Sequence, residues 1–235
     1  MLAALEDIHV TLERWNQSLC RSIAVGGFIS CCPIAHKWKA PYRMAVLRET
    51  LMWRMEDLAR QSVLPADNGH ILGARILLRS AIETLALLIY TNQKMKAVLA
   101  GTFSFFALDE VTKQLLLGSK NGVTEQQAVN ILTVLGHAEK DHEGLVEMHQ
   151  HLSENAHPNY DGVTLGYSST NPREHETTFH NNWLRYFGKE QEPGVAFVLA
   201  VFEHEYNNVW TELFSQLEEW LRVHDAELEA QRAGS

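Results

Sequence analysis

The chain has 235 residues, of which 46% are hydrophobic, and its formal net charge at pH 7 is −9. That hydrophobic content is sufficient for a folded core and excludes a largely disordered chain. The charge is uneven, because residues 1–120 carry 14 Lys and Arg against 10 Asp and Glu, whereas residues 121–235 carry 6 against 19. An acidic protein binds RNA weakly without specific contacts, so a polyanion would have to meet the basic first part.

The first residues and the cysteines favour a cytoplasmic protein. The stretch Met1–Asp7 lacks the basic region and apolar run of a signal peptide. The three cysteines, Cys20 and the neighbours Cys31 and Cys32, are an odd number without a disulfide pattern, which is typical of a reducing compartment. We therefore expect a cytoplasmic protein that does not enter a membrane.

The N-terminal third predicts two helices. Apolar residues at spacings of three and four predict an amphipathic helix from about Leu2 to Ala24, which ends near Gly26-Gly27. Residues 28–40 are expected to form a loop. Pro41 then opens a second helix, and residues 65–69 form a turn.

The central helix is expected over residues 69–99. It contains no proline, and apolar residues occupy nearly every direction around its axis, so it is predicted to be surrounded by protein. The apolar run Ile71–Ile89 is long enough to span a membrane, but three charges on one face make it a poor spanning segment.

The remainder of the chain predicts further helices and one long loop. The longest stretch without helical periodicity covers residues 158–192, and a loop of that length is commonly functional or mobile. The expected helices cover residues 108–117, a segment with Thr124 as N-cap that ends near Gly136, residues 141–156, and a final helix from Pro193 to about Ala230.

These elements predict an all-α fold, a helical bundle with the central helix in its middle. We expect a single domain over residues 1–235. Its core would comprise residues 41–230, with the N-terminal helix and loop of residues 1–40 as an appendage.

A charged stripe runs along the central helix. Arg75, Arg79 and Glu83 are four residues apart and therefore share one face. Ionised groups on a buried helix are destabilising unless they are paired. The stripe predicts either a structural Arg79–Glu83 ion pair or a polar pocket inside the bundle.

A second cluster of polar residues follows on the segment 149–162. Seven of the twelve histidines lie between His137 and His180, and the segment 149–162 adds an acid, a hydroxyl and amides. A helix end that leads into a loop suits general acid–base chemistry, because its side chains are held and still reach solvent. Alternatively, these side chains only satisfy backbone groups at the helix end.

Two segments resemble bacterial proteins of the HEPN-like helical class. They are Arg79-Ser80-Ala81-Ile82-Glu83 and the helix end Leu152-Ser153-Glu154-Asn155-Ala156-His157-Pro158-Asn159. The resemblance implies a helical bundle that dimerises and acts as a metal-independent ribonuclease in toxin–antitoxin systems or phage defence. The usual motif of that class is an Arg, four to six residues and a His. Here the positions 150–152 before His157 hold Gln, His and Leu.

The resemblance implies roles for several residues in and beside the two segments. His157 would be the general acid or base, Arg79 would stabilise charge on the phosphorane, and Glu83 would orient Arg79. Either Arg79 approaches His157 in space, or His151 stands in place of the motif Arg. The remaining binding residues would be Arg75, His151, Ser153, Glu154, Asn155 and Asn159. The expected partners are RNA, a second copy of the chain and an antitoxin or regulator, without a cofactor.

Two other functions remain open. The chain could be a catalytically silent helical module that binds a protein partner, in which case the charged stripe is structural. It could also hold a metal, because Glu139–His142 and Glu154–His157 have a spacing that places both ligands on one face of a helix.

Overall fold

The computed structural model describes residues 7–234. Within this range the chain forms ten α-helices, two π-helical segments and one two-stranded sheet, so the predicted all-α fold is confirmed. The helices are α1 (Ile8–Ser18), α2 (Val25–Cys31), α3 (Pro33–His36), α4 (Lys39–Asp67), α5 (Ile71–Leu99), α6 (Phe105–Leu117), α7 (Ile131–Ala138), α8 (Leu145–Ala156), α9 (Trp183–His204) and α10 (Trp210–Ala233). The π-helical segments are η1 (Tyr160–Leu165) and η2 (Glu205–Val209), and the strands are β1 (Ser168–Asn171) and β2 (Glu176–Phe179).

The chain divides into two compact units. The first unit contains residues 7–18, 53–85 and 138–201, and the second contains residues 19–52, 86–137 and 202–234. Residues 7–18 and 19–40 are thus parts of these units. The expected single domain stays a prediction.

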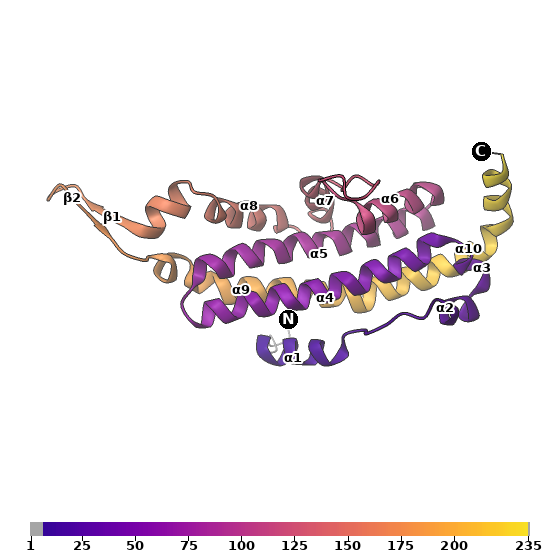
Figure 1. Ribbon diagram of the computed structural model, residues 1–235, viewed down its shortest axis with the longest axis horizontal. Coiled ribbons are helices and arrows are strands. Elements are labelled where there is room, and N and C mark those ends of the chain that lie inside the picture. The colour runs from indigo at the N-terminus through magenta and orange to yellow at the C-terminus, as the bar shows by residue number, and fades with distance from the viewer. Residues whose placement is uncertain (1–6, 235) are drawn as a thin grey trace. The chain divides into compact units, whose positions relative to one another are not determined.

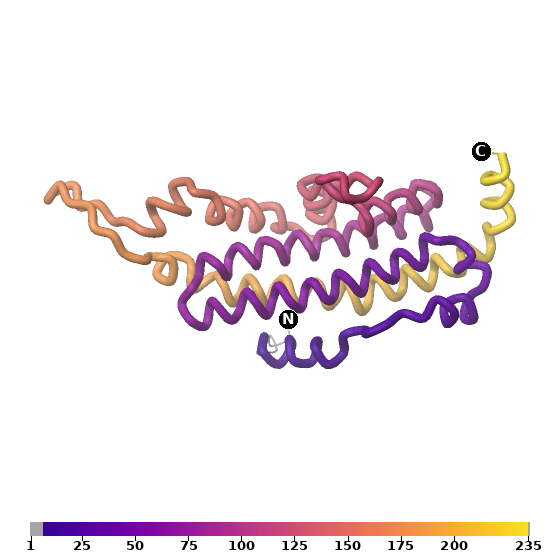
Figure 2. Tube along the Cα trace, viewed as in Figure 1, coloured from indigo at the N-terminus to yellow at the C-terminus, as the bar shows by residue number. Residues whose placement is uncertain are grey.

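The first unit is built on the beginning of α5. Figures 1 and 2 show α8 beside this part of α5, and the chain then passes through η1 and the β1–β2 hairpin before it returns into α9. The hairpin is antiparallel, with Ser168 opposite Phe179 and Asn171 opposite Glu176. A buried cluster of Ile71, Trp183 and Phe187 joins α5 to α9.

The second unit has an aromatic and aliphatic core. Leu88 and Ile89 of α5, Leu108 of α6, and Leu217 and Leu221 of α10 are each at most 1% exposed. Helix α6 begins at an N-cap serine, because the Ser104 hydroxyl accepts the backbone N–H of Ala107 at 3.1 Å.

The two long helices of the N-terminal half were predictable. Helix α5 lies within the expected range 69–99, and α4 has Pro41 in its first turn, where a missing N–H is tolerated. Pro65 lies in the last turn of α4 and does not end it early. Within residues 7–234, no helix is both long and apolar enough to cross a membrane.

The expected N-terminal helix and the loop after it are wrong in part. The helix in the structure is α1, and the predicted residues 1–6 lie outside the described range. The expected loop over residues 28–40 contains part of α2, all of α3 and the start of α4. Gly26 and Gly27 lie inside α2, because the helix penalty of a glycine, about 1 kcal/mol relative to alanine, does not alone end a helix.

The expected loop over residues 158–192 is also wrong. It holds η1, the hairpin and the beginning of α9, which starts ten residues before Pro193. Trp183 and Phe187 are four residues apart and buried, so the apolar face of α9 begins before the proline. Pro193 lies on the exposed side of α9. The expected final helix is interrupted by η2 and continues as α10.

Two shorter helices begin later than expected. Helix α7 starts at Ile131, so Thr124 is not its N-cap. Helix α8 starts at Leu145, directly after Gly144, whose φ of 97° lies in the left-handed region that favours glycine. Its end at Ala156 agrees with the prediction.

Candidate functional site: the polar seam between α5 and α8

The charged stripe of α5 faces a row of polar residues on α8. We call the three residues of this stripe and their three partners on α8 the polar seam. Residues later in α5 pair with residues earlier in α8. The two helices therefore run antiparallel in the first unit, as can be followed in Figure 2. The paired residues are Arg75 with Asn155, Arg79 with Ser153, and Glu83 with His149.

Arg79 is held from two sides. Its Nε donates to the hydroxyl of Ser153 at 2.8 Å, and its Nη2 lies 3.2 Å from Oε1 of Glu83. The Ser153 hydroxyl in turn donates to the carbonyl of His149 at 2.7 Å. The expected Arg79–Glu83 ion pair is therefore present. The side chain of Arg79 is still 30% exposed, so the pair reaches the surface.

Glu83 connects Arg79 to a buried histidine. Nε2 of His149 lies 3.0 Å from Oε1 of Glu83, and the side chain of His149 is 4% exposed. The hydrogen bond from His149 lowers the pKa of the Glu83 carboxyl most, and the charge of Arg79 lowers it further against the opposing effect of burial. Glu83 is thus held as a carboxylate that orients Arg79.

Arg75 and Asn155 form the buried end of the seam. The side chain of Arg75 is 3% exposed, and its Nε donates to Oδ1 of Asn155. Its guanidinium lies 4.9 Å from the ring centre of Phe187 and 3.4 Å from Oε2 of Glu190. Burial lowers the pKa of Arg75 and Glu190 acts against this. Since Arg75 and Asn155 are buried, the geometry does not support their expected role as substrate contacts.

His151 lies at the open edge of this buried pair. Its Nδ1 is 3.5 Å from Nη2 of Arg75 and 3.9 Å from Oε2 of Glu190, and its side chain is 46% exposed. The ring packs against Phe187 with centres 6.1 Å apart. His151 is therefore positioned by a charged group on each side and remains accessible to solvent.

His157 ends α8 and presents an exposed ring. Its backbone is extended, with φ of −86° and ψ of 148°, and its N–H donates to the carbonyl of Ser153 at 3.1 Å. Its carbonyl accepts the N–H of Asn159 at 2.8 Å. Within residues 7–234 its ring makes no hydrogen bond or ion pair, and none joins it to Arg79. Ser153, which binds Arg79, lies one helical turn before His157, about 6 Å along the helix axis.

The segment after α8 fixes this helix end. Asn159 caps η1, because its Oδ1 accepts the N–H of Gly162 at 3.1 Å, and its amide nitrogen donates to Glu154. A Cβ on Gly162 would lie 2.0 Å from the His157 carbonyl oxygen, so only glycine fits there. Asn159 and Glu154 therefore have a structural function in this end of α8.

The two expected metal pairs do not form a site. Within the described residues, no group of three or more His, Cys, Asp and Glu is arranged to hold a metal ion. Glu139 and His142 follow the end of α7 in a turn, so they do not share a helical face. The Glu139 carboxylate instead accepts the backbone N–H groups of Gly144 and Val146, both at 2.8 Å. His157 likewise lies outside the helical part of α8.

The sequence did not indicate two residues of this site. Phe187 and Glu190 lie on α9, within the segment expected to be a loop. The pair Trp183 and Phe187, with Glu190 one turn later, was the available signal of an amphipathic helix that faces Arg75.

The family spacing of an Arg, six residues and a His also occurs at Arg173 and His180. Arg173 lies in the hairpin turn and His180 follows the far end of β2. The four extended residues of β2 alone span about 13 Å, so the hairpin separates the backbones of Arg173 and His180.

Comparison with known proteins assigns neither a family nor a function to the chain. No protein-family model matches this chain, and neither does a curated protein or a solved structure. The function is therefore argued from the geometry of the polar seam and from the chemistry of its residues.

Proposed function

We propose that this chain is a metal-independent endoribonuclease of the HEPN-like class. The observation that carries the proposal is the partly exposed Arg79 in the middle of the polar seam. Arg79 is oriented by Glu83 and Ser153 and is 30% exposed, and its partner Ser153 lies four residues before His157, whose side chain is exposed. An oriented cation and an accessible imidazole are groups that RNA cleavage through the 2′-hydroxyl can use.

In the proposed reaction the ribose 2′-oxygen attacks the adjacent phosphorus. The 2′-hydroxyl loses its proton, the bond from phosphorus to the 5′-oxygen breaks, and that oxygen takes up a proton. The products are a 2′,3′-cyclic phosphate and a 5′-hydroxyl. His157 acts as the base that accepts the 2′ proton or as the acid that supplies the 5′ proton.

Arg79 stabilises the negative charge that develops on the phosphorane. Within residues 7–234 its Nε contacts Ser153 and its Nη2 contacts Glu83, so its Nη1 remains for a phosphate oxygen. Glu83 and Ser153 are positioning residues, because they hold the guanidinium in one orientation before substrate arrives. His151, an exposed residue of α8, is a further group for binding the RNA chain.

The test is cleavage of a short RNA by the purified chain in the presence of EDTA. A general acid or base contributes about 10²- to 10⁴-fold, so His157→Ala should reduce the rate at least about 100-fold. The matched control is His70→Ala, which removes another exposed histidine from the first unit. The control should cleave at the wild-type rate, and both variants should keep the wild-type melting temperature. Unchanged cleavage by His157→Ala would contradict the assignment.

A catalytically silent binding module is the second candidate. It is favoured by one observation: the contacts of Arg79 among residues 7–234 are both within the chain, to Glu83 of the same helix and to Ser153, which joins α5 to α8. In this case the chain would not cleave RNA at any protein concentration, and its partner would be a regulator or a second copy of the chain. The absence of cyclic-phosphate products with the wild-type chain would select this candidate over the nuclease.

A further inference from the structure

A cavity of about 410 Å³ in the second unit has a strongly basic lining. It is formed at the junction of α3 and α4, along one face of α6 and at the end of α10. We call it the basic pocket. Its lining residues are Lys37, Trp38, Lys39, Arg43, Phe105, Phe106, Asp109, Lys113 and Arg232. Ligand pockets of small molecules typically have about 300–1,000 Å³, so the volume is sufficient for one.

The charge of the basic pocket is opposite to that of the protein. Five of its nine lining residues are Lys or Arg and one is Asp, although the whole chain carries 29 acidic residues against 20 basic ones. These residues come from three distant parts of the sequence, so they are brought together only by the fold. A positive, concave surface on an acidic protein favours an anionic ligand.

Three of the five cations are already paired with carboxylates. Lys37 lies 2.6 Å from Asp225 and from Glu229, and Arg43 lies 2.6 Å from Asp109. Lys113 also pairs with Asp109, at 3.3 Å. These pairs fix the walls of the basic pocket.

The other two cations are available. Lys39 and Arg232 have no acidic partner among residues 7–234, and both are exposed. Lys39 is also the first residue of the 29-residue helix α4, where backbone N–H groups carry partial positive charge. The basic pocket therefore offers an anion two cations that have no acidic partner among residues 7–234.

Aromatic rings form the rest of the wall. Trp38 packs edge-on against Phe105 and Phe106, with ring centres 5.5 and 6.1 Å apart, and the guanidinium of Arg232 lies 5.9 Å from the Trp38 ring. Trp38 and Phe105 are buried, whereas Phe106 is only partly buried and lines the cavity. A planar group can stack on an aromatic ring or on a guanidinium.

We propose that the basic pocket binds a nucleoside phosphate. The phosphate is held by Lys39 and Arg232, and the base stacks on Phe106. A simple anion would use the cations and leave the ring without a partner, whereas an uncharged aromatic compound would leave the cations unpaired. A nucleotide uses both features. This site is formed by second-unit residues only and does not depend on the proposed ribonuclease activity.

The test is calorimetric titration of the full chain with adenosine 5′-monophosphate, with adenosine and inorganic phosphate as separate probes. The nucleotide should bind at least tenfold more tightly than either fragment, and added salt should weaken it. Lys39→Gln combined with Arg232→Gln should abolish binding of the nucleotide. Phe106→Leu keeps the charge and should weaken binding about tenfold, in line with the loss of one stacked ring.

The matched control is Lys120→Gln, which removes an exposed lysine of the second unit outside the basic pocket and should bind as the wild type does. Three outcomes would overturn the proposal: no binding of the nucleotide at millimolar concentration, equal affinities for nucleotide and inorganic phosphate, or wild-type binding by the Lys39 and Arg232 double variant. His157→Ala should bind the nucleotide as the wild type does, which separates this test from that of the ribonuclease.

Discussion

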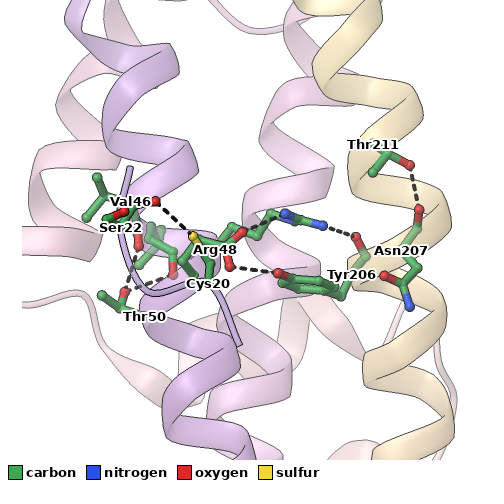
Figure 3. A network of polar contacts seen from close by, with 10 residues as sticks. Cys20, Ser22, Val46, Arg48, Thr50, Tyr206, Asn207 and Thr211 are labelled. Atoms are coloured by element: carbon green, nitrogen blue, oxygen red, sulfur yellow. Dashed lines mark hydrogen bonds and ion pairs between the residues drawn. The ribbon is translucent and has the colours of Figure 1, made fainter. Parts of the chain in front are cut away.

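The chain uses the same pair of side chains, an arginine with a glutamate, in two different surroundings. In the polar seam of the first unit, Arg79 pairs with Glu83 and remains 30% exposed. In the second unit, Nη1 of Arg48 lies 2.6 Å from Glu49, and the side chain of Arg48 is 16% exposed. Figure 3 shows Arg48 directed at the backbone of Tyr206, whose carbonyl accepts from Nη2 at 3.2 Å.

The difference is produced by aromatic rings. The guanidinium of Arg48 lies 3.6 Å from the ring centre of Tyr206 and 4.5 Å from that of Trp210, and the Tyr206 hydroxyl donates to Glu49 at 2.8 Å. Tyr206 belongs to η2, the π-helical turn between α9 and α10. Arg48 is thus covered on its faces and serves stability, whereas no ring closes over Arg79 within the described residues. Access, and not residue type, distinguishes a structural pair from a candidate catalytic one.

The largest expected difference concerns catalysis. Arg79→Gln removes the positive charge from the open pair, so RNA cleavage should fall about 10²- to 10³-fold. Arg48→Gln should leave the cleavage rate per folded molecule unchanged. Rates are measured at 20 °C on samples whose folded fraction is known from circular dichroism. Equal losses in the two variants would remove the distinction between the two pairs.

The next difference concerns stability, where Arg48→Gln should have a larger effect than Arg79→Gln. Arg48→Gln leaves the Glu49 carboxylate, whose side chain is 13% exposed, without its cation, so the free energy of unfolding should fall by about 3 kcal/mol. Arg79→Gln, at a pair open to solvent, should lower it by about 1 kcal/mol. Urea unfolding of both variants measures the two values. A larger loss for Arg79→Gln would show that the Arg79–Glu83 pair contributes more to stability than the Arg48–Glu49 pair.

The contribution of Glu83 to the free energy of unfolding should depend on pH. The pKa of Glu83 is lowered in the folded state, chiefly by the hydrogen bond from His149, so its stabilising contribution is present above the ordinary value of 4.5. That contribution is lost as the pH falls through the lower, folded-state pKa. The difference in unfolding free energy between wild type and Glu83→Gln should therefore be about 1 kcal/mol at pH 6 and shrink toward pH 3. A constant difference over this range would contradict the assigned role of the charge.

The smallest expected effect lies at alkaline pH in the closed network. Burial raises the pKa of Tyr206 above its ordinary value of 10.0, so the folded state keeps the phenol protonated where the unfolded chain loses that proton. Stability from Tyr206 is present below pH 10 and is lost as the pH rises through the folded-state pKa.

Tyr206→Phe is the matched variant for this effect. It should lower the unfolding free energy by about 1 kcal/mol at pH 7, because the hydrogen bond to Glu49 is lost. Its thermal midpoint should fall less between pH 9 and pH 11 than that of the wild type. The same slope in both proteins would show that Tyr206 ionises freely.

The helical fold was predictable because the apolar pattern of its helices extends over long segments of the sequence. Helix α5 repeats its apolar pattern over 29 residues, and that pattern alone required a buried helix. Boundaries at proline and glycine were not predictable in the same way. Pro65 and Pro193 lie inside helices, because tertiary packing of residues such as Trp183 compensates for the local penalty.

Residues of the candidate site were named from the sequence on both helices, but the pairs that they form were not predictable. Spacing placed Arg75, Arg79 and Glu83 on one face, but periodicity does not fix the register between two helices. The pairing with Ser153 and His149 therefore required the structure. The run Lys37-Trp38-Lys39 was a local signal of the basic pocket, but its other cations are spread from residue 43 to residue 232, so the pocket itself was not predictable.

The most direct test of the ribonuclease assignment uses one RNA in two forms. The first is unmodified, and the second carries a single 2′-deoxy nucleotide at the mapped cleavage position. With EDTA present, the wild-type chain should cut the first RNA and leave a 2′,3′-cyclic phosphate, and it should leave the second RNA intact at that position. Cleavage of the 2′-deoxy RNA at the same position, or no cleavage of either RNA by an excess of the protein, would contradict the assignment.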